Sequence, residues 1–111
     1  MQIDKQMIGD VLVVSLDGEL DSRTAAQTQH ALAELVPQAD KIVLNLARMH
    51  YMSSAGLRVM LLVYRQANAA GVRLVLVDLP VNVREVMSAT GFLDFFTVSD
   101  SVPAGVEVLG R

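Results

Sequence analysis

The chain repeats a pattern in which short apolar runs alternate with segments whose apolar residues recur every three or four positions. Apolar runs rich in β-branched residues are typical of buried strands, and the wider spacing is typical of helices packed on one face. After an opening hairpin, the order of segments is α-β-α-β-α-β-α with short connections. This order predicts an α/β fold, in which right-handed crossovers build a largely parallel sheet with helices packed on it.

Strands are predicted in the opening hairpin and in three later segments. The hairpin pairs residues 3–7 with the run 11–16 across a turn at Gly9-Asp10, and Asp17-Gly18-Glu19-Leu20 is expected to break the strand pattern. The apolar runs of the next two strands suggest burial on both faces of the sheet. The later strands are predicted at 41–46, 72–77 and 92–98.

Four helices are predicted between and after these strands. The first is expected over 24–36, with Asp21 or Ser22 as its N-cap and Pro37 after its end. The second follows Ser53-Ser54 and has the clearest pattern, because apolar residues recur at helical spacing before Gly71 ends the helix. Its expected core stripe is Leu57, Met60, Leu61, Tyr64 and Ala67. The remaining helices are predicted at 81–90 and, after Asp100 or Ser101, through residue 109.

The composition favours one folded domain that spans residues 1–111. Hydrophobic residues make up 52% of the chain and charged residues 19%, which is enough apolar surface for a self-sufficient core. The net charge is −3 and the nine Lys and Arg residues are scattered, which argues against nucleic-acid binding. Because there is no cysteine, no signal-peptide pattern and no apolar run long enough to span a membrane, we expect a cytoplasmic domain without a membrane partner.

Motifs that would indicate an enzyme are absent from the sequence. The chain has no Gly-x-Gly-x-x-Gly or Walker A pattern, and no serine lies in Gly-x-Ser-x-Gly. His30 is expected on the surface of a helix, and His50 in the loop after the strand 41–46. A dyad of His50 with Ser54 is the alternative, although no carboxylate lies nearby in sequence to orient the imidazole. We therefore predict no catalytic residue and no metal site.

The segment Ser53-Ser54-Ala55-Gly56 opens the strongest predicted helix and has two interpretations. In the first, a serine is only an N-cap, whose hydroxyl accepts a hydrogen bond from the first turn and contributes about 1 kcal/mol. In the second, a serine also carries a phosphate, because the unpaired N–H groups and the helix dipole favour negative charge there. The small side chains would leave a shallow surface for a partner or kinase. The residues alone leave both interpretations open.

Three stretches of the sequence carry a resemblance to a known family. They are Leu16-Asp17-Gly18-Glu19-Leu20-Asp21, Ile42-Val43-Leu44-Asn45-Leu46 and Tyr51-Met52-Ser53-Ser54-Ala55-Gly56-Leu57. Together they resemble the STAS domains, and in particular the bacterial anti-sigma factor antagonists. The similarity covers nearly the whole chain. It implies a sheet of four or five strands with helices packed mainly on one face.

The resemblance also implies how the domain would act. In the partner switching of this family, a serine kinase of the GHKL type holds a sigma factor or another effector captive. The unphosphorylated antagonist binds the kinase and releases the captive, phosphorylation of the antagonist ends that binding, and a PPM-type phosphatase restores it. ATP belongs to the kinase, so the antagonist needs no cofactor. The alternative within the family is a structural STAS subunit that is never phosphorylated, for example one docked on the ATPase of a bacterial lipid transporter.

The family's usual segment is Asp-Ser-Ser/Thr-Gly-Leu, and its match to this chain implies that Ser54 is the phosphate acceptor, with Ser53 the less favoured choice. Ser53 stands where the family has an acidic residue, and Ala55 stands where it has a second hydroxyl. Asp21 matches the aspartate of the Gly-x-Leu/Ile-Asp stretch, which is implied to lie near the acceptor. The residues expected to contact the partner are Asp21, Ser53, Ala55, Gly56 and Arg58, although Arg58 could equally be a solvated surface residue.

Overall fold

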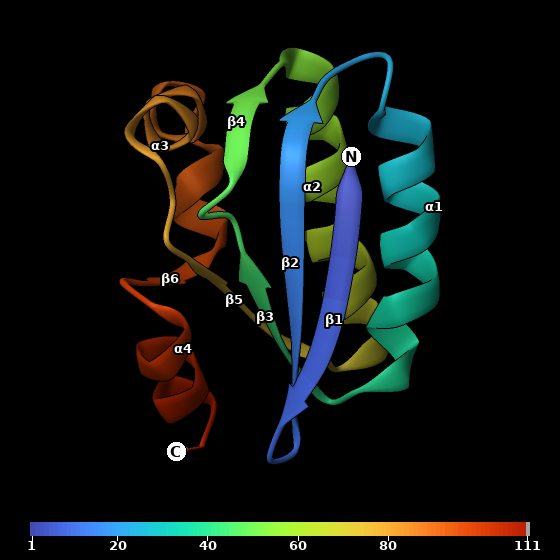
Figure 1. Ribbon diagram of the computed structural model, residues 1–111, viewed down its shortest axis with the longest axis vertical. Coiled ribbons are helices and arrows are strands. Elements are labelled where there is room, and N and C mark those ends of the chain that lie inside the picture. The colour runs from blue at the N-terminus through green and yellow to red at the C-terminus, as the bar shows by residue number, and fades with distance from the viewer. Residues whose placement is uncertain (111) are drawn as a thin grey trace.

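A six-stranded sheet runs through the protein in the computed structural model, which describes residues 1–110 (Figure 1). Five strands follow the order β1-β2-β3-β5-β6, and β4 pairs with the end of β2. The β1–β2 hairpin is antiparallel, and every other pairing is parallel. The prediction of a mostly parallel α/β sheet is confirmed, with one strand more than expected. The strands are β1 (Gln2–Ile8), β2 (Val11–Leu20), β3 (Lys41–Asn45), β4 (Met49–Met52), β5 (Arg73–Val77) and β6 (Thr97–Ser99).

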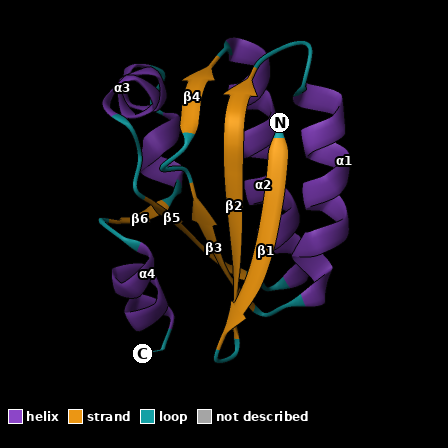
Figure 2. Ribbon diagram, viewed as in Figure 1, coloured by secondary structure: helices purple, strands orange, loops and turns teal. Residues whose placement is uncertain are grey.

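Helices cover the sheet unequally on its two faces (Figure 2). α1, α2 and α3 contribute side chains to the larger core, whereas α4 packs on a smaller apolar cluster of β2, β3 and β5. The expectation of helices mainly on one face is therefore confirmed, with α4 as the exception. The helices are α1 (Ala25–Leu35), α2 (Ser54–Ala70), α3 (Val81–Ala89) and α4 (Val102–Leu109), with 3-10 helices at Val36–Gln38 and Phe92–Phe95.

The two cores explain the continuous apolar runs of the central strands. Successive side chains of a strand point to opposite faces, so a strand covered on both sides needs apolar residues at every position. In β3, Ile42 and Leu44 belong to the larger core and Val43 belongs to the cluster under α4. The prediction that this strand is buried on both faces is confirmed. On α4, Gly105 allows the close contact, because a Cβ there would lie 2.8 Å from Val77 Cγ1.

The region around β2 and β4 differs from the sequence-based expectation. β2 continues to Leu20 through a register shift at Gly18 and Glu19, where Gly18 has φ of +129° and donates its N–H to the Arg48 carbonyl at 3.0 Å. A bulge of this kind lets a strand bend without ending, which is why the Asp-Gly pair was wrongly expected to break it. β4 was missed because its two central residues, His50 and Tyr51, are exposed and form no apolar run.

The predicted strand 92–98 is wrong in its first half. Phe92–Phe95 form a 3-10 helix after Gly91, which has φ of +78°, and β6 begins only at Thr97. The aromatic residues that suggested a strand pack instead on α2, where Tyr64 lies 5.6 Å from the Phe95 ring and 5.4 Å from the Phe96 ring. Tertiary packing here overrides the preference of aromatic residues for strands.

The structure also corrects two predictions about the helices, the N-cap of α1 and the buried face of α2. Neither Asp21 nor Ser22 caps α1; they lie in the turn before Thr24, which occupies the N-cap position. On α2 the buried stripe is shifted from the expected one, because Leu61 and Tyr64 are only half-buried. Its buried residues are Gly56, Leu57, Val59, Met60, Val63 and Ala67. None of the described helices is long and apolar enough to cross a membrane.

Candidate functional site

The start of α2 lies beside the end of β2, because β2 and β4 are parallel neighbours. Leu20 pairs with Met52 at the last position of both strands, and the Ser53 N–H donates to the Leu20 carbonyl at 2.9 Å. The next residue along each strand is Asp21 after β2 and Ser53 after β4. Figure 1 shows the two strands ending at the same edge of the molecule, where α2 begins. The two motifs that sequence separates are therefore adjacent in space.

Gly56 sets how closely α2 approaches this edge. A Cβ at this position would lie 2.6 Å from the Leu20 carbonyl oxygen, 2.9 Å from Leu20 Cγ and 3.0 Å from Met52 Cγ. Backbone atoms cannot move away from such a contact at low cost, so any side chain here would push the helix outward. Gly56 is buried and was expected to contact a partner; its position instead assigns it an internal packing role.

Ser53 acts as the N-cap of α2. Its backbone is extended, its hydroxyl accepts a hydrogen bond from the Gly56 N–H at 3.4 Å, and its carbonyl accepts from the Leu57 N–H at 2.9 Å. The capping interpretation of this serine pair is therefore confirmed for Ser53. The Ser53 hydroxyl, N–H and carbonyl therefore all form hydrogen bonds within the fold.

Ser54 is placed differently from its neighbour. It is the first residue of α2, its side chain is exposed, and its hydroxyl has no hydrogen-bond partner within residues 1–110. The first-turn N–H groups beside it have no acceptor one turn earlier in the helix, so this end carries a partial positive charge. A negatively charged group on the Ser54 oxygen would meet favourable electrostatics from the backbone itself.

An ion-pair network lies on the loop that follows β2. The Arg23 guanidinium donates through Nη2 to Asp21 Oδ2 at 2.9 Å and to Glu19 Oε2 at 3.1 Å, and the Arg23 N–H donates to Asp21 Oδ1 at 2.9 Å. The Asp21 side chain is only 13% exposed, and its hydrogen bond from the Arg23 side chain lowers the pKa of its carboxyl. Asp21 is thus held ionised beside the start of α2.

Sequence reasoning found Asp21 but missed Arg23 and Glu19. The only available signal was charge spacing, since the two acids lie two and four residues before the arginine. Thr24 completes the loop by donating its hydroxyl to the Glu19 carbonyl at 2.8 Å and accepting from the Asp21 N–H at 3.1 Å. These hydrogen bonds stabilise the loop next to Ser53.

Ala55 and Arg58 lie near Ser54 on α2. Ala55 is half-buried, and Arg58 is exposed one helical turn beyond Ser54. Arg58 makes no ion pair with any residue that the structure describes. Its exposed position fits both a contact with a partner and a solvated surface arginine, so the expected role of Arg58 stays a prediction.

Neither histidine is paired with a serine within the described residues. His50 lies in β4 rather than in a loop, and its Nε2 is 3.9 Å from Asp17 Oδ1. This carboxylate was not foreseen, because it is distant in sequence and is brought near by the pairing of β2 with β4. His30 is exposed on α1, 3.2 Å from Glu34. The part of the chain that the structure describes also contains no group of three potential metal ligands.

Comparison with known proteins places this chain in a family. The model of the STAS domain matches residues 2–105. BtrV of Bordetella bronchiseptica, named as a candidate anti-sigma factor antagonist, is 42% identical over 105 residues, which cover 91% of this chain and 88% of BtrV. The anti-sigma F factor antagonist of Paenibacillus polymyxa is 29% identical over 103 residues, with the same two coverages of 91% and 88%.

Solved structures agree at the level of the fold. The unphosphorylated form of the anti-sigma factor antagonist SpoIIAA superposes with a TM-score of 0.78 at 24% identity, covering 99% of this chain and 98% of SpoIIAA. The phosphorylated form of the Bacillus SpoIIAA superposes with a TM-score of 0.72 at 21% identity, covering 97% and 99%. On the family match and the BtrV identity together, this chain belongs to the STAS domain family, in the branch of the anti-sigma factor antagonists.

Proposed function

We propose that this chain is an anti-sigma factor antagonist that works by partner switching, with Ser54 as its phosphate acceptor. When unphosphorylated it binds a GHKL-type serine kinase that serves as the anti-sigma factor, and phosphorylation of Ser54 releases it. A PPM-type phosphatase returns it to the binding form. In this role the domain acts in the cytoplasm as a binding protein, without catalytic residues or a cofactor of its own.

The observation that carries the proposal is the difference between the two adjacent serines. The Ser53 hydroxyl is bonded to the Gly56 N–H, whereas the Ser54 hydroxyl is exposed and has no partner within the described residues. A kinase can reach an exposed hydroxyl without opening the fold, whereas transfer to Ser53 would remove the cap of α2. This contrast favours Ser54 independently of the family motif.

A phosphate on Ser54 would act on the interface rather than on the fold. At the helix start it meets the positive end of the dipole, which tolerates two added negative charges. In a desolvated interface the same dianion costs several kcal/mol, which is enough to displace a partner of micromolar affinity, about 8 kcal/mol of binding free energy. The released form would therefore stay folded and ready for the phosphatase.

The surface that we propose for the kinase surrounds Ser54. It consists of Ser53, Ala55 and Arg58 on α2 and Asp21 on the neighbouring loop. Arg58 adds an exposed positive charge that no described carboxylate pairs, and Asp21 is held by Arg23 in the loop beside Ser53; charges placed in this way help to orient a partner. Gly56 contributes from beneath by keeping α2 against Leu20.

The proposal is tested by phosphorylation of the purified chain. Incubation with the cognate kinase and ATP should increase the intact mass by about 80 Da, the mass of one phosphate group. Ser54→Ala should abolish the increase, and Ser53→Ala, the matched control, should retain it. A phosphorylated species that survives Ser54→Ala would overturn the assignment of the acceptor.

The alternative, a structural STAS subunit docked on a lipid-transport ATPase, makes the opposite prediction. Such a subunit would gain no mass with any co-encoded serine kinase, and Ser54→Asp would leave its complex intact. The two functions are also separated by the neighbouring genes, since kinase and phosphatase genes accompany a switch and transporter genes accompany a subunit.

A further inference from the structure

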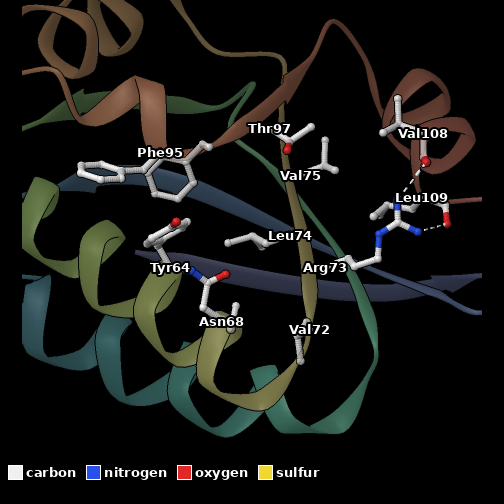
Figure 3. A pocket seen from close by; sticks show the side chains of 12 residues that line it. Tyr64, Asn68, Val72, Arg73, Leu74, Val75, Phe95, Thr97, Val108 and Leu109 are labelled. Carbon is white, nitrogen blue, oxygen red and sulfur yellow. Dashed lines mark hydrogen bonds between the residues drawn. The ribbon is translucent and has the colours of Figure 1, made fainter.

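A pocket of about 320 Å³ lies at the far end of α2 from Ser54 (Figure 3). It opens over the first half of β5, because the pairing of β5 with β6 begins only at Val75 and leaves Arg73 and Leu74 without a strand on that side. Its volume is at the lower end of the range of about 300–1,000 Å³ found for small-molecule sites. Its lining comes from α2, β5, β6, the 3-10 helix Phe92–Phe95 and the end of α4.

One wall of the pocket is aromatic. The Tyr64 ring lies 5.6 Å from the Phe95 ring, and Phe95 is 51% exposed although it lines a hollow. Figure 3 shows Tyr64 and Phe95 on one side of Leu74, with Arg73 and α4 on the other. An aromatic ring presents a flat apolar face, and stacking a second ring on it contributes affinity beyond the area that is buried.

Three neutral polar side chains of the pocket are unpaired within the described residues. The Tyr64 hydroxyl, the Asn68 side-chain amide and the Thr97 hydroxyl line it, and within residues 1–110 none of the three makes a hydrogen bond. Tyr64 and Asn68 are one helical turn apart, so their polar ends lie on the same side of α2. Concave sites with an apolar wall and a few polar groups are the usual form of a small-molecule site.

Arg73 gives the pocket its charge. Of the described residues that line the pocket, Arg73 alone is charged, and no carboxylate is among them. Its guanidinium donates through Nη1 to the Leu109 carbonyl at 3.1 Å and through Nη2 to the Val108 carbonyl at 3.3 Å. A guanidinium has five N–H donors, so two bonds to carbonyls leave it able to bind a carboxylate as well.

We propose that this pocket binds a small aromatic carboxylate that crosses the open edge of β5 at Leu74, with its ring packed on Phe95 and Tyr64 on the α2 side and its carboxylate bound by Arg73 on the α4 side (Figure 3). The charge of Arg73 selects an anion, the aromatic wall selects a ring, and Asn68 and Thr97 supply the remaining hydrogen bonds. The site is separate from the acceptor, because Tyr64 lies ten residues beyond Ser54 on α2, roughly 15 Å along the helix axis. Binding here can therefore be measured without a kinase.

The test uses the complete chain and 3-phenylpropanoate as the probe. In a titration followed by two-dimensional NMR, we expect saturable shifts of the Leu74 and Thr97 backbone amides and the Asn68 side-chain amide, with a dissociation constant on the order of 1 mM for so small a probe. Propanoate, which lacks the ring, and 3-phenylpropanamide, which lacks the charge, should each bind about tenfold more weakly or worse.

Variants separate this site from unspecific binding. Phe95→Ala removes an exposed ring and should weaken binding about tenfold, while Arg65→Gln, an exposed arginine on α2 outside the pocket, should leave it unchanged. Arg73→Gln should weaken binding of the carboxylate but not of the amide. A titration without saturable shifts, shifts centred elsewhere, or a Phe95→Ala variant that binds like the parent chain would each overturn the proposal.

Discussion

The two ends of α2 meet the rest of the molecule in opposite ways. At its start the helix is pressed against β2, where Gly56 leaves no room for even a methyl group beside the Leu20 carbonyl. Towards its other end, where β6 does not pair with the first residues of β5, Tyr64 and Asn68 line a pocket of about 320 Å³. The side chains differ in size: a glycine faces the Leu20 carbonyl at the start of the helix, and aromatic side chains line the pocket near its other end. The start of α2 holds the Ser53 hydroxyl in a hydrogen bond, and the region near its other end contains an open pocket.

The largest effect is expected from a methyl group at the start of α2. Gly56→Ala should lower the free energy of unfolding by about 3 kcal/mol, because the added Cβ meets backbone rather than a side chain that could move. Gly71→Ala, at the C-cap of the same helix, should cost only about 1 kcal/mol, since its φ of +72° is strained for alanine but nothing lies within 4 Å. Urea unfolding measures both. Equal losses of stability in the two variants would contradict the close contact of Gly56 with the Leu20 backbone.

A charge at the start of α2 should affect binding more than folding. Ser54→Asp should fold like the parent chain but bind the kinase about a hundredfold more weakly, a loss of about 2.7 kcal/mol. Calorimetry with the cognate kinase measures the affinity, and Ser54→Asn, of the same shape without charge, is the control. If both variants lose affinity equally, shape rather than charge ends the binding.

The two serines should differ in their contribution to stability. Ser53→Ala removes the cap and should lower the free energy of unfolding by about 1 kcal/mol. Ser54→Ala, which loses no hydrogen bond within the described residues, should change it by less than about 0.5 kcal/mol. Thermal or urea unfolding compares the pair directly. The reverse order would contradict the capping role of Ser53.

The smallest effect concerns the acid titration of Asp21. Its hydrogen bond from the Arg23 side chain lowers its pKa in the folded state, so ionised Asp21 stabilises the fold above the unfolded-state pKa of about 3.8. That stabilisation is lost as the pH falls through the lower, folded-state value. Arg23→Gln should move the Asp21 pKa back towards 3.8, as measured by NMR titration of the carboxyl carbon. An unchanged pKa would mean that Arg23 does not hold Asp21 ionised.

Much of the fold followed from the sequence because it depends on local patterns. The apolar runs of β3 and β5 predicted strands that are covered on both faces. The helical spacing of apolar residues predicted that α2 ends at Gly71, as it does. β4 could not be predicted, because its exposed His50 and Tyr51 give no periodic signal and its pairing depends on a bulge at Gly18 in another strand. The helical turn at Phe92–Phe95 likewise depends on aromatic contacts with a distant helix.

The candidate site, like the fold, was predicted from the sequence only in part. The sequence by itself determined that a serine pair opens the strongest helix, and the family motif selected Ser54 from that pair. The structure showed which serine uses its hydroxyl as the cap and that Arg23 pairs with Asp21, both local contacts, and only tertiary packing decided that Gly56 faces inward. Local sequence sets helix starts because caps and turns are formed within a few residues. Burial and the neighbours of a site depend on which strands pair, and here the pairing of β2 with β4 brought Asp21 beside Ser53.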